Sequence, residues 1–319
     1  MTPSLSGLLA ALREQSGIAH KRDIQRVAEA LRNSWPHAFP NGDDSAVIAD
    51  EQGPLLLAME GFINEFVAAD PWFAGWCGVM VNLSDIAAMG GRPLAIVNAL
   101  WSAGETQAEQ ILAGMCAASR TYQVPIVGGH TNLRSNQPQL AVAVLGRAAR
   151  LLNSFTVRAG QDLLVAINLD GRWHPPGHNW DAVTGADPQR LRAALALLPE
   201  MAEAGIIAAA KDISQAGLAG TLVMMLESAQ LGAQLNLDAV PKPAECDWLR
   251  WLCAFPSFGF LLACEPEQSE RAIARFAACG ISAAVAGRFL PGRQLMISQG
   301  SEAHCFWDLQ QNPLTGMGH

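Results

Sequence analysis

The sequence predicts an α/β or α+β fold that is divided into two domains. The chain has 319 residues, and a typical domain has about 100–200. Half of the residues are hydrophobic, which is enough for two buried cores. Short apolar runs typical of strands alternate with longer runs of helical spacing. We place the boundary in the polar, irregular segment 150–158, which gives an N-terminal domain of residues 1–150 and a C-terminal domain of residues 151–319.

In the first domain, turn and stop signals separate the predicted elements. The turn sequence Asn41-Gly42-Asp43-Asp44 precedes a short apolar strand. A helical pattern that starts at Pro71 ends at Gly90-Gly91 followed by Pro93, a typical helix stop. We expect helices over residues 5–12, 23–32, 71–89 and 106–122, and strands over residues 45–48, 55–59, 94–100, 124–127 and 139–147.

The second domain begins with a strongly apolar strand at residues 162–167. A polar loop rich in Pro, Gly, His and Trp follows at residues 170–187; we interpret it as a substrate lid, because long loops are often functional, and the alternative is a plain surface excursion. The remaining pattern predicts helices over residues 189–204, 218–231 and 267–279, and strands over residues 258–264 and 283–289.

Composition and charge exclude several classes of protein. The chain has 21 Lys and Arg against 29 Asp and Glu, a net charge of −8, whereas nucleic-acid binders carry a basic patch or a high pI. No apolar run reaches the ~18 residues of a membrane span, and the N-terminus lacks signal-peptide features. The seven cysteines are scattered without a C-x-x-C pair, which is typical of free thiols in a reducing compartment. We therefore expect a cytoplasmic protein that binds neither nucleic acid nor membrane.

Five acidic residues stand at or near the ends of predicted elements rather than along polar helix faces. They are Asp43, Asp44, Glu60, Asp85 and Asp212. Mg²⁺ prefers oxygen ligands, and several carboxylates brought together repel one another unless a cation neutralises them. If these residues converge, they predict a magnesium site. The alternatives are an Asx-type turn for the pair, a surface position for Glu60 and a helix N-cap for Asp212.

Asp85 lies near the end of an otherwise apolar helical pattern. Asn82 is three residues earlier and shares its helix face. The carboxylate must then be either satisfied inside the protein or exposed, and a solvated helix face is the alternative to a functional site.

Two further segments are candidates for contact with phosphate. Gly128 and Gly129 follow an apolar strand and precede His130 and Thr131; glycines allow backbone N–H groups to approach a phosphate closely. The alternative is an ordinary tight turn, with His130 as a hydrogen-bonded turn residue. Lys21 can reach a phosphate, or it is part of a solvated basic helix start.

The order of these motifs resembles the AIR synthetase (PurM-like) superfamily, which includes AIR synthetase, thiamine-monophosphate kinase and selenophosphate synthetase. The series is G-D-D-S-A-V-I, N-L-S-D-I-A-A-M-G-G-R-P, V-G-G-H-T and D-I-S-Q-A-G-L, and it extends from about Gly42 to Phe289. The stretch from Lys211 to Glu227, with the later F-P-S-F-G-F-L-L, is similar to an uncharacterised AIR-synthetase-related branch.

The resemblance implies a fold and a set of roles. It implies two α/β domains, with the first domains of two subunits paired through their sheets in a homodimer. It implies that Asp44, Asp85 and Asp212 hold Mg²⁺ and the phosphates of ATP, with Asp43 as a neighbouring acid and Glu60 as a further ligand. It also implies a phosphate-side loop that contains Gly128, Gly129 and Thr131; Asn82 and His130 stand beside the matched positions, and Lys21 is the candidate phosphate-contacting base.

The sequence departs from the pattern at three positions. His130 stands where thiamine-monophosphate kinase has Asp, Glu60 stands where relatives often have Asp, and Gln215 replaces an acid of D-I-S-D-G. No Cys precedes Lys21, so selenium chemistry is not expected.

We expect an enzyme that uses Mg²⁺ and ATP to phosphorylate or activate an oxygen of a small-molecule substrate, in a ligase-like or kinase-like reaction. Three alternatives stay open. They are a thiamine-monophosphate-kinase-like phosphotransferase, an ATP-binding regulatory or scaffold protein without turnover, and an ATP-independent metal hydrolase.

Overall fold

The computed structural model describes residues 4–31, 34, 39–175 and 177–317. The chain forms two compact units. We call one the five-stranded unit, which comprises Asp44–Leu151 and Gly185–Glu200, and the other the seven-stranded unit, which comprises Met1–Asp43, Leu152–Thr184 and Met201–His319. The mixed α/β architecture predicted from the sequence is confirmed. The first 43 residues are grouped with the second half of the chain, and the roles predicted for domains 1–150 and 151–319 stay predictions.

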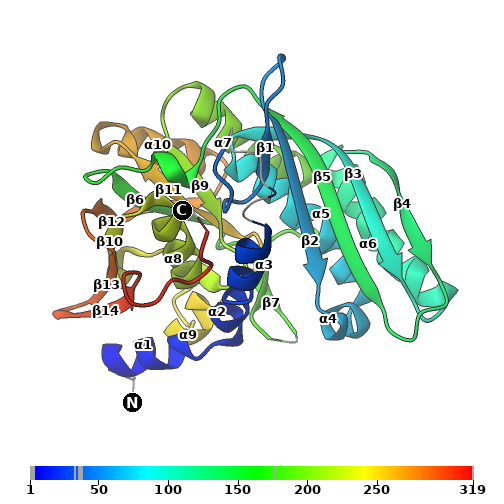
Figure 1. Ribbon diagram of the computed structural model, residues 1–319, viewed down its shortest axis with the longest axis horizontal. Coiled ribbons are helices and arrows are strands. Elements are labelled where there is room, and N and C mark those ends of the chain that lie inside the picture. The colour runs from blue at the N-terminus through cyan, green and yellow to red at the C-terminus, as the bar shows by residue number, and fades with distance from the viewer. Residues whose placement is uncertain (1–3, 32–33, 35–38, 176, 318–319) are drawn as a thin grey trace. The chain divides into compact units, whose positions relative to one another are not determined.

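The five-stranded unit contains a mixed sheet with the strand order β1-β2-β5-β3-β4. All neighbouring strands are antiparallel except the parallel pair of β3 and β4. Figure 1 shows β5 between β2 and β3, although it is the last of the five along the chain. The strands are β1 (Ala46–Ile48), β2 (Leu55–Phe62), β3 (Gly91–Trp101), β4 (Ile126–Asn132) and β5 (Gln139–Ala148).

Helix α5 (Pro71–Ala88) is the buried centre of this unit, and every residue from Phe73 to Ala88 is buried. On one side, a Cβ at Gly78 would come within 2.9 Å of the Val142 side chain on β5. On another side, a Cβ at Gly75 would lie 2.0 Å from the Ile111 carbonyl oxygen of α6 (Glu105–Tyr122). The glycines therefore let α5 pack closely against both the sheet and α6, and a helix enclosed in this way is apolar nearly all round. The unit also contains α4 (Asn64–Ala69) and most of α7 (Pro188–Glu203).

The seven-stranded unit is built on a sheet with the order β14-β13-β10-β12-β6-β11-β9. All neighbours are antiparallel except the parallel pair of β10 and β13. All residues of β6 and β11 are buried. The strands are β6 (Asp162–Ile167), β9 (Ala209–Asp212), β10 (Gly232–Asn236), β11 (Gly259–Cys264), β12 (Ser282–Leu290), β13 (Gln294–Gln299) and β14 (Glu302–Asp308).

Both faces of this sheet are covered at its centre. Val165 of β6 belongs to a hydrophobic core with residues of α8 (Gly217–Ala229) such as Leu222, and α10 (Pro266–Ala278) contacts β6, β11 and β12. Because successive strand residues point to opposite faces, a strand covered on both sides is apolar throughout. The unit also contains α1 (Leu5–Arg13), α2 (Ser16–Lys21), α3 (Ile24–Leu31) and α9 (Trp248–Leu252), with the short 3₁₀ helices η2 (Ser154–Thr156) and η3 (Leu237–Ala239).

The C-terminal segment is fastened to α8 by one buried carboxylate. Glu227 accepts hydrogen bonds from the backbone N–H groups of Leu314 and Thr315, both at 2.8 Å, and from the Thr315 hydroxyl at 2.5 Å. Gln25 of α3 donates to the Leu314 carbonyl oxygen at 3.1 Å. The tail thus connects α3 to α8 inside the same unit.

Most of the helices and strands predicted from the sequence are present with boundaries shifted by a few residues, and two predictions are wrong. The strand predicted at 124–127 is β4, which runs through Gly128 and Gly129 and is largely exposed, so the double glycine is neither a loop nor a tight turn. The predicted loop 170–187 contains a hairpin of β7 (Arg172–His174) and β8 (Asn179–Asp181). Among the described residues, no helix is both long enough and apolar enough to span a membrane.

Candidate active site

Asp43, from the first acidic motif, is held in a buried ion pair in the seven-stranded unit. Lys211 Nζ donates to Asp43 Oδ1 at 2.9 Å, and the two side chains are only 4% and 2% exposed. Ser154 also donates to Asp43, through its backbone N–H to Oδ2 at 2.6 Å and through its hydroxyl to Oδ1 at 3.1 Å. A charged pair of this kind is kept in a protein interior only when hydrogen bonds complete it.

Asp212 ends β9 and is 1% exposed. The Ser257 hydroxyl donates to Asp212 Oδ2 at 2.9 Å. Helix α8 begins at Gly217, with Ala216 at its N-cap, so the alternative that Asp212 caps this helix is wrong. The helix starts this close to α9 because Gly217 has a φ of +65° and lies against the Leu252 carbonyl, where any Cβ would clash.

Helix α2, which was not among the helices predicted from the sequence, places Lys21 beside the Asp212 motif. A Cβ at Gly17 would lie 2.1 Å from the carbonyl oxygen of Gln215, so the two backbones are in direct contact there. Lys21 is four residues after Gly17 and therefore lies on the same side of the helix. Lys21 is half-buried, and both interpretations of it, a contact with phosphate and a solvated side chain, stay open.

Asn82 and Asp85 lie one turn apart inside α5, with exposures of 0% and 6%. The alternative of a solvated helix face is therefore wrong. Asn82 Nδ2 donates to the Gly78 carbonyl at 2.8 Å, whereas Asn82 Oδ1 has no hydrogen-bond partner among the described residues. A buried amide oxygen of this kind calls for a water, an ion or a ligand.

Glu60 lies on β2 opposite Val142 of β5. It shares a strand face with the buried residues Leu56 and Ala58, and it is half-buried rather than fully exposed. Asp44 immediately precedes β1, is also half-buried and is followed by the buried Ser45. Both acids thus belong to the five-stranded unit.

The G-G-H-T segment lies on β4 at the edge of the five-stranded sheet. Gly129, His130 and Thr131 pair with residues 98–100 of β3. A Cβ at Gly129 would lie 2.4 Å from the Asn98 carbonyl oxygen, so the close strand pairing requires glycine. The ring of His130 lies 5.7 Å from that of Trp101. At Gly128 the space around the backbone is open, which leaves room for a ligand.

The β7–β8 hairpin is packed against α9 through aromatic rings. Trp180 meets Trp173 at 5.2 Å and Trp251 at 5.1 Å between ring centroids, and the Arg250 guanidinium lies 3.9 Å above Trp173. Burial, together with the charge of Arg250, lowers the pKa of His178, so its imidazole is neutral at pH 7. The hairpin is therefore a structured element; its role as a substrate lid stays a prediction.

The candidate residues are divided between the two units. The seven-stranded unit holds Lys21, Asp43 and Asp212, and the five-stranded unit holds Asp44, Glu60, Asn82, Asp85 and the segment 128–131. Within the described part of the chain, no three His, Cys, Asp or Glu side chains are grouped to hold a metal ion. Convergence of the acids on one Mg²⁺ site stays a prediction.

Three residues that donate hydrogen bonds to the candidate acids were not predicted from the sequence, namely Lys211, Ser154 and Ser257. Lys211 carried a usable signal: it ends the apolar run Ala208-Ala209-Ala210, and a lysine in a buried strand requires an acidic partner. The two serines carried none, because they lie 111 and 45 residues from the acids that they contact.

Two known proteins have sequences similar to this chain over most of its length. An uncharacterised protein of Synechocystis sp. is 47% identical to this chain, and the alignment covers 98% of each. A thiamine-monophosphate kinase of Synechococcus elongatus is 29% identical over 67% of this chain and 72% of the kinase.

A solved structure shares the fold. T. maritima PurL complexed with ATP superposes with a TM-score of 0.75 at 18% identity, covering 98% of this chain and 55% of PurL. The chain thus spans about half the length of that protein.

Two family domains match in the order that the motifs predicted. Residues 42–148 match the AIR synthase related protein N-terminal domain, and residues 165–297 match the corresponding C-terminal domain. The chain therefore belongs to the AIR synthase related protein family.

Proposed function

We propose that this protein is an Mg²⁺- and ATP-dependent enzyme that phosphorylates, or activates as a phosphate ester or anhydride, an oxygen atom of a small molecule. The observation that carries the proposal is the polar pair Asn82 and Asp85 inside the buried helix α5. Asn82 Oδ1 is buried and has no hydrogen-bond partner among the described residues, and a buried polar atom of this kind calls for a ligand, an ion or a water. With the Asp85 carboxylate one turn further along the helix, this atom indicates a ligand site. One relative is named as a kinase, and T. maritima PurL binds ATP, which agrees with this class of reaction.

In this proposal, Asp44, Glu60, Asp85 and Asp212 hold Mg²⁺, and Asn82 Oδ1 accepts a hydrogen bond from a water in the same site. When bound, Mg²⁺ neutralises charge on the phosphate oxygens. The open backbone at Gly128 and the Thr131 hydroxyl contact the phosphates, and Lys21 donates to them. The His130 ring, on the adjacent strand residue, points to the opposite face of the sheet from Thr131. The substrate oxygen attacks the γ-phosphorus, and ADP leaves with the electron pair of the broken P–O bond.

We also propose that the chain forms a homodimer through the uncovered face of the five-stranded sheet. Met59, Ala143 and Val97 lie directly opposite one another on β2, β5 and β3, so their side chains share a face. Met59 is 65% exposed and Val97 is 44% exposed. A contiguous apolar surface of this kind on a sheet is typical of a protein interface.

The test of the enzyme proposal is nucleotide binding followed by turnover. Binding of a non-hydrolysable ATP analogue is measured by calorimetry with and without Mg²⁺, and ADP release is measured with Mg²⁺, ATP and a panel of small phosphates, carboxylates and amides. Asp85→Asn should weaken Mg²⁺-dependent binding by about 10–100-fold, as loss of a metal-site group does. Glu109→Gln, on the exposed side of α6, is the matched control and should bind as the parent does. If the parent protein shows no Mg²⁺-dependent binding of the ATP analogue, the proposal is wrong.

A second candidate is an ATP-binding regulatory protein without turnover. It is favoured by His130 and Gln215, which stand where related sequences have acids, and by the contact that fixes the Gln215 backbone against Gly17. ADP release separates the two candidates, because the regulatory protein binds Mg²⁺ and ATP but releases no ADP with any member of the panel.

A further inference from the structure

We propose that Lys211 and Asp43 form a positioning pair, through which one buried ion pair fixes the backbone beside two predicted Mg²⁺ ligands. Asp43 directly precedes Asp44, and Lys211 directly precedes Asp212. The Lys211 Nζ to Asp43 Oδ1 distance is 2.9 Å, and both side chains are more than nine-tenths buried. This inference rests on the proposed function, because it concerns how the ligands for the cation are held.

The hydrogen bonds of Asp43 favour a positioning role over direct metal binding. Its two carboxylate oxygens accept three hydrogen bonds, one from the Lys211 ammonium and two from Ser154. An ammonium in contact with a carboxylate already neutralises its charge and repels a divalent cation. Asp43 therefore acts through its chain neighbour, and Asp44 is the member of the motif that binds the cation.

Successive side chains along β9 separate the two tasks of the second motif. Lys211 and Asp212 are adjacent strand residues, so their side chains point to opposite faces of the sheet. Lys211 points to Asp43, and Asp212 points to the Ser257 hydroxyl. Because β9 pairs with β11 from Lys211↔Leu261 to Phe260↔Asp212, the backbone that carries both side chains is fixed.

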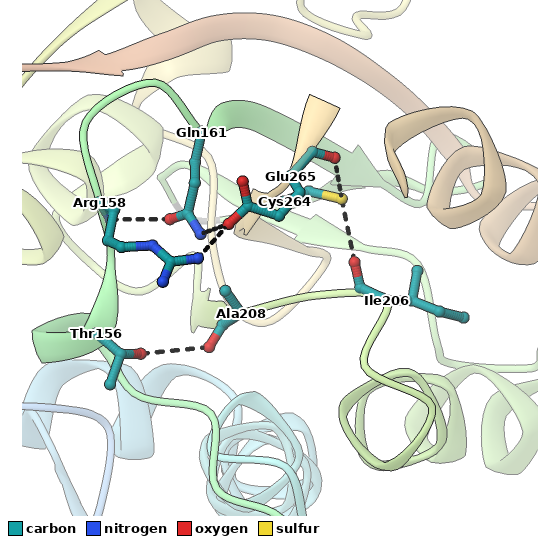
Figure 2. A network of polar contacts seen from close by, with 7 residues as sticks. All are labelled: Thr156, Arg158, Gln161, Ile206, Ala208, Cys264 and Glu265. Carbon is teal, nitrogen blue, oxygen red and sulfur yellow. Dashed lines mark hydrogen bonds and ion pairs between the residues drawn. The ribbon is translucent and has the colours of Figure 1, made fainter. Parts of the chain in front are cut away.

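The segment that follows Ser154, the second donor to Asp43, is hydrogen-bonded to residues next to β9 and β11 (Figure 2). Ser154 begins η2, and the Thr156 hydroxyl donates to the Ala208 carbonyl just before β9, at 3.4 Å. A few residues later, Arg158 and Gln161 both donate to Glu265, which follows β11, at 2.5 and 2.8 Å. The hydrogen bonds from Gln161 and Arg158 lower the pKa of Glu265, so this carboxylate is charged at pH 7 and accepts from both residues.

A further hydrogen bond holds the residue before Asp43. The Ser228 hydroxyl, at the end of α8, donates to the Gly42 carbonyl oxygen at 3.2 Å. The G-D-D turn is therefore bound by β9, η2 and α8 of the seven-stranded unit up to Asp43, and the five-stranded unit begins at Asp44. The position of Asp44 relative to Asp43 depends only on the few backbone dihedrals between them.

The experiment compares Lys211→Met with the double variant Lys211→Met/Asp43→Leu. The single change leaves a buried carboxylate without its cation and is expected to lower stability, whereas the double change removes both charges and should fold. The measured quantity is the Mg²⁺ concentration that gives half-maximal binding of a non-hydrolysable ATP analogue. If the pair positions the ligands, the double variant still requires about 10–100-fold more Mg²⁺, as is typical when groups behind metal ligands are lost. Lys211→Arg keeps the charge and should recover much of the loss.

The control is Arg288→Met, which removes a different cation from a buried acid of the same unit, Asp162. It should lower stability without changing the Mg²⁺ requirement. A double variant that folds and needs no more Mg²⁺ than the parent would overturn the inference, since the pair would then be only structural.

A second readout separates failure of the inference from failure of the proposed function. Hydrogen exchange of the Asp44 and Ser45 amides in the parent and the double variant needs no nucleotide. Faster exchange in the double variant, by tenfold or more, is the expected result. Unchanged exchange overturns the positioning inference even if the parent binds Mg²⁺ and ATP; a parent that binds neither refutes the proposed function while this readout still tests whether the pair fixes the turn.

Discussion

The two sheets of the chain differ in how far the chain itself covers them. In the seven-stranded sheet, all six residues of β6 and all six of β11 are buried. In the five-stranded sheet, β2 alternates between buried and exposed residues, with Leu56 at 0% and Leu57 at 44%. Both β2 and β6 are apolar runs in the sequence, so an apolar strand does not by itself indicate what covers its second face.

The uncovered face has the composition of an interior rather than of a surface. Of the large hydrophobic residues that are exposed among the described residues, many lie on this one sheet: Ile48, Leu57, Met59, Leu94, Val97 and Val127. Single exposed hydrophobic residues are ordinary, but a cluster on one sheet is not. This difference between the two sheets supports the proposal that a second copy of the chain covers the exposed face of the five-stranded sheet.

The largest effect is expected at the uncovered face. Met59→Asp places a charge at its centre and removes the burial of one methionine from each subunit, about 1.5–3 kcal/mol for each copy. The dimer should weaken by about 100-fold or more, because each 1.4 kcal/mol is tenfold in affinity. Sedimentation velocity over a range of concentrations measures this change.

Gln110→Asp on the exposed side of α6 adds the same single negative charge, and as the charge-matched control it should leave the mass unchanged. A Met59→Asp protein that sediments as the parent does would show that this face is not the interface, and the comparison between the sheets would lose its functional meaning.

The next largest effect is expected inside the doubly covered sheet. Leu164 of β6 is 0% exposed, on the central strand between β11 and β12. Leu164→Ala removes buried methyl groups and leaves a cavity, at a cost of about 2–5 kcal/mol. The free energy of unfolding is measured by urea unfolding at a protein concentration too low for a dimer to form.

The matched variant is Leu57→Ala on β2, where the side chain is 44% exposed. It should cost less than about 1 kcal/mol in the monomer, since surface substitutions usually lie within ~0.5 kcal/mol. If Leu164→Ala and Leu57→Ala lowered the free energy of unfolding equally, the two sheets would not differ in how far the chain covers them.

A smaller effect is expected at Asp162, the first residue of β6. Asp162 accepts from the Ser269 hydroxyl at 2.8 Å and from the Arg288 guanidinium at 3.1 Å, and the Asp162 side chain is 9% exposed. Asp162→Asn keeps the shape but weakens both hydrogen bonds, so we expect a loss of about 1–3 kcal/mol. Thermal and urea unfolding check it, with Asp162→Glu as a charge-preserving comparison; a loss below 0.5 kcal/mol would show that the half-exposed Arg288 contributes little.

The order of motifs predicted the family and the fold, and local rules predicted most element boundaries. The stop signal Gly90-Gly91 placed the end of α5 within a residue, because helix ends depend on nearby residues. β4 was placed wrongly because glycine reads as a turn residue, whereas here Gly129 permits close pairing with Asn98. Pairing partners far apart in sequence leave no local signal.

The candidate site was predictable only in part, for the same reason. Asp85 was singled out because a carboxylate interrupts an apolar helix, and its 6% exposure shows that the interruption lies in the interior. The pairing of Asp43 with Lys211 joins residues 168 positions apart, and the grouping of the first 43 residues with the C-terminal half depends on such contacts. Physical rules on a single sequence identify that Lys211 needs an acid but not which one.

The smallest effect is expected at the exposed ion pair of the five-stranded sheet, which sharpens the contrast with Asp162. The Arg147 guanidinium donates to Asp50, and this hydrogen bond, followed by one from the Gln52 backbone N–H, lowers the pKa of Asp50 below its usual 3.8. A carboxyl group whose pKa is lower in the folded state stabilises the fold above its unfolded pKa, and that contribution is lost as pH falls through the folded pKa. Asp50→Asn should therefore lower the unfolding midpoint slightly at pH 7, because exposed pairs contribute little, and the difference from the parent should shrink as the pH falls below 3.8. An NMR titration that gives Asp50 a pKa of 3.8 or above would show that Arg147 does not hold this carboxylate in solution, and the difference in midpoint should then not depend on pH.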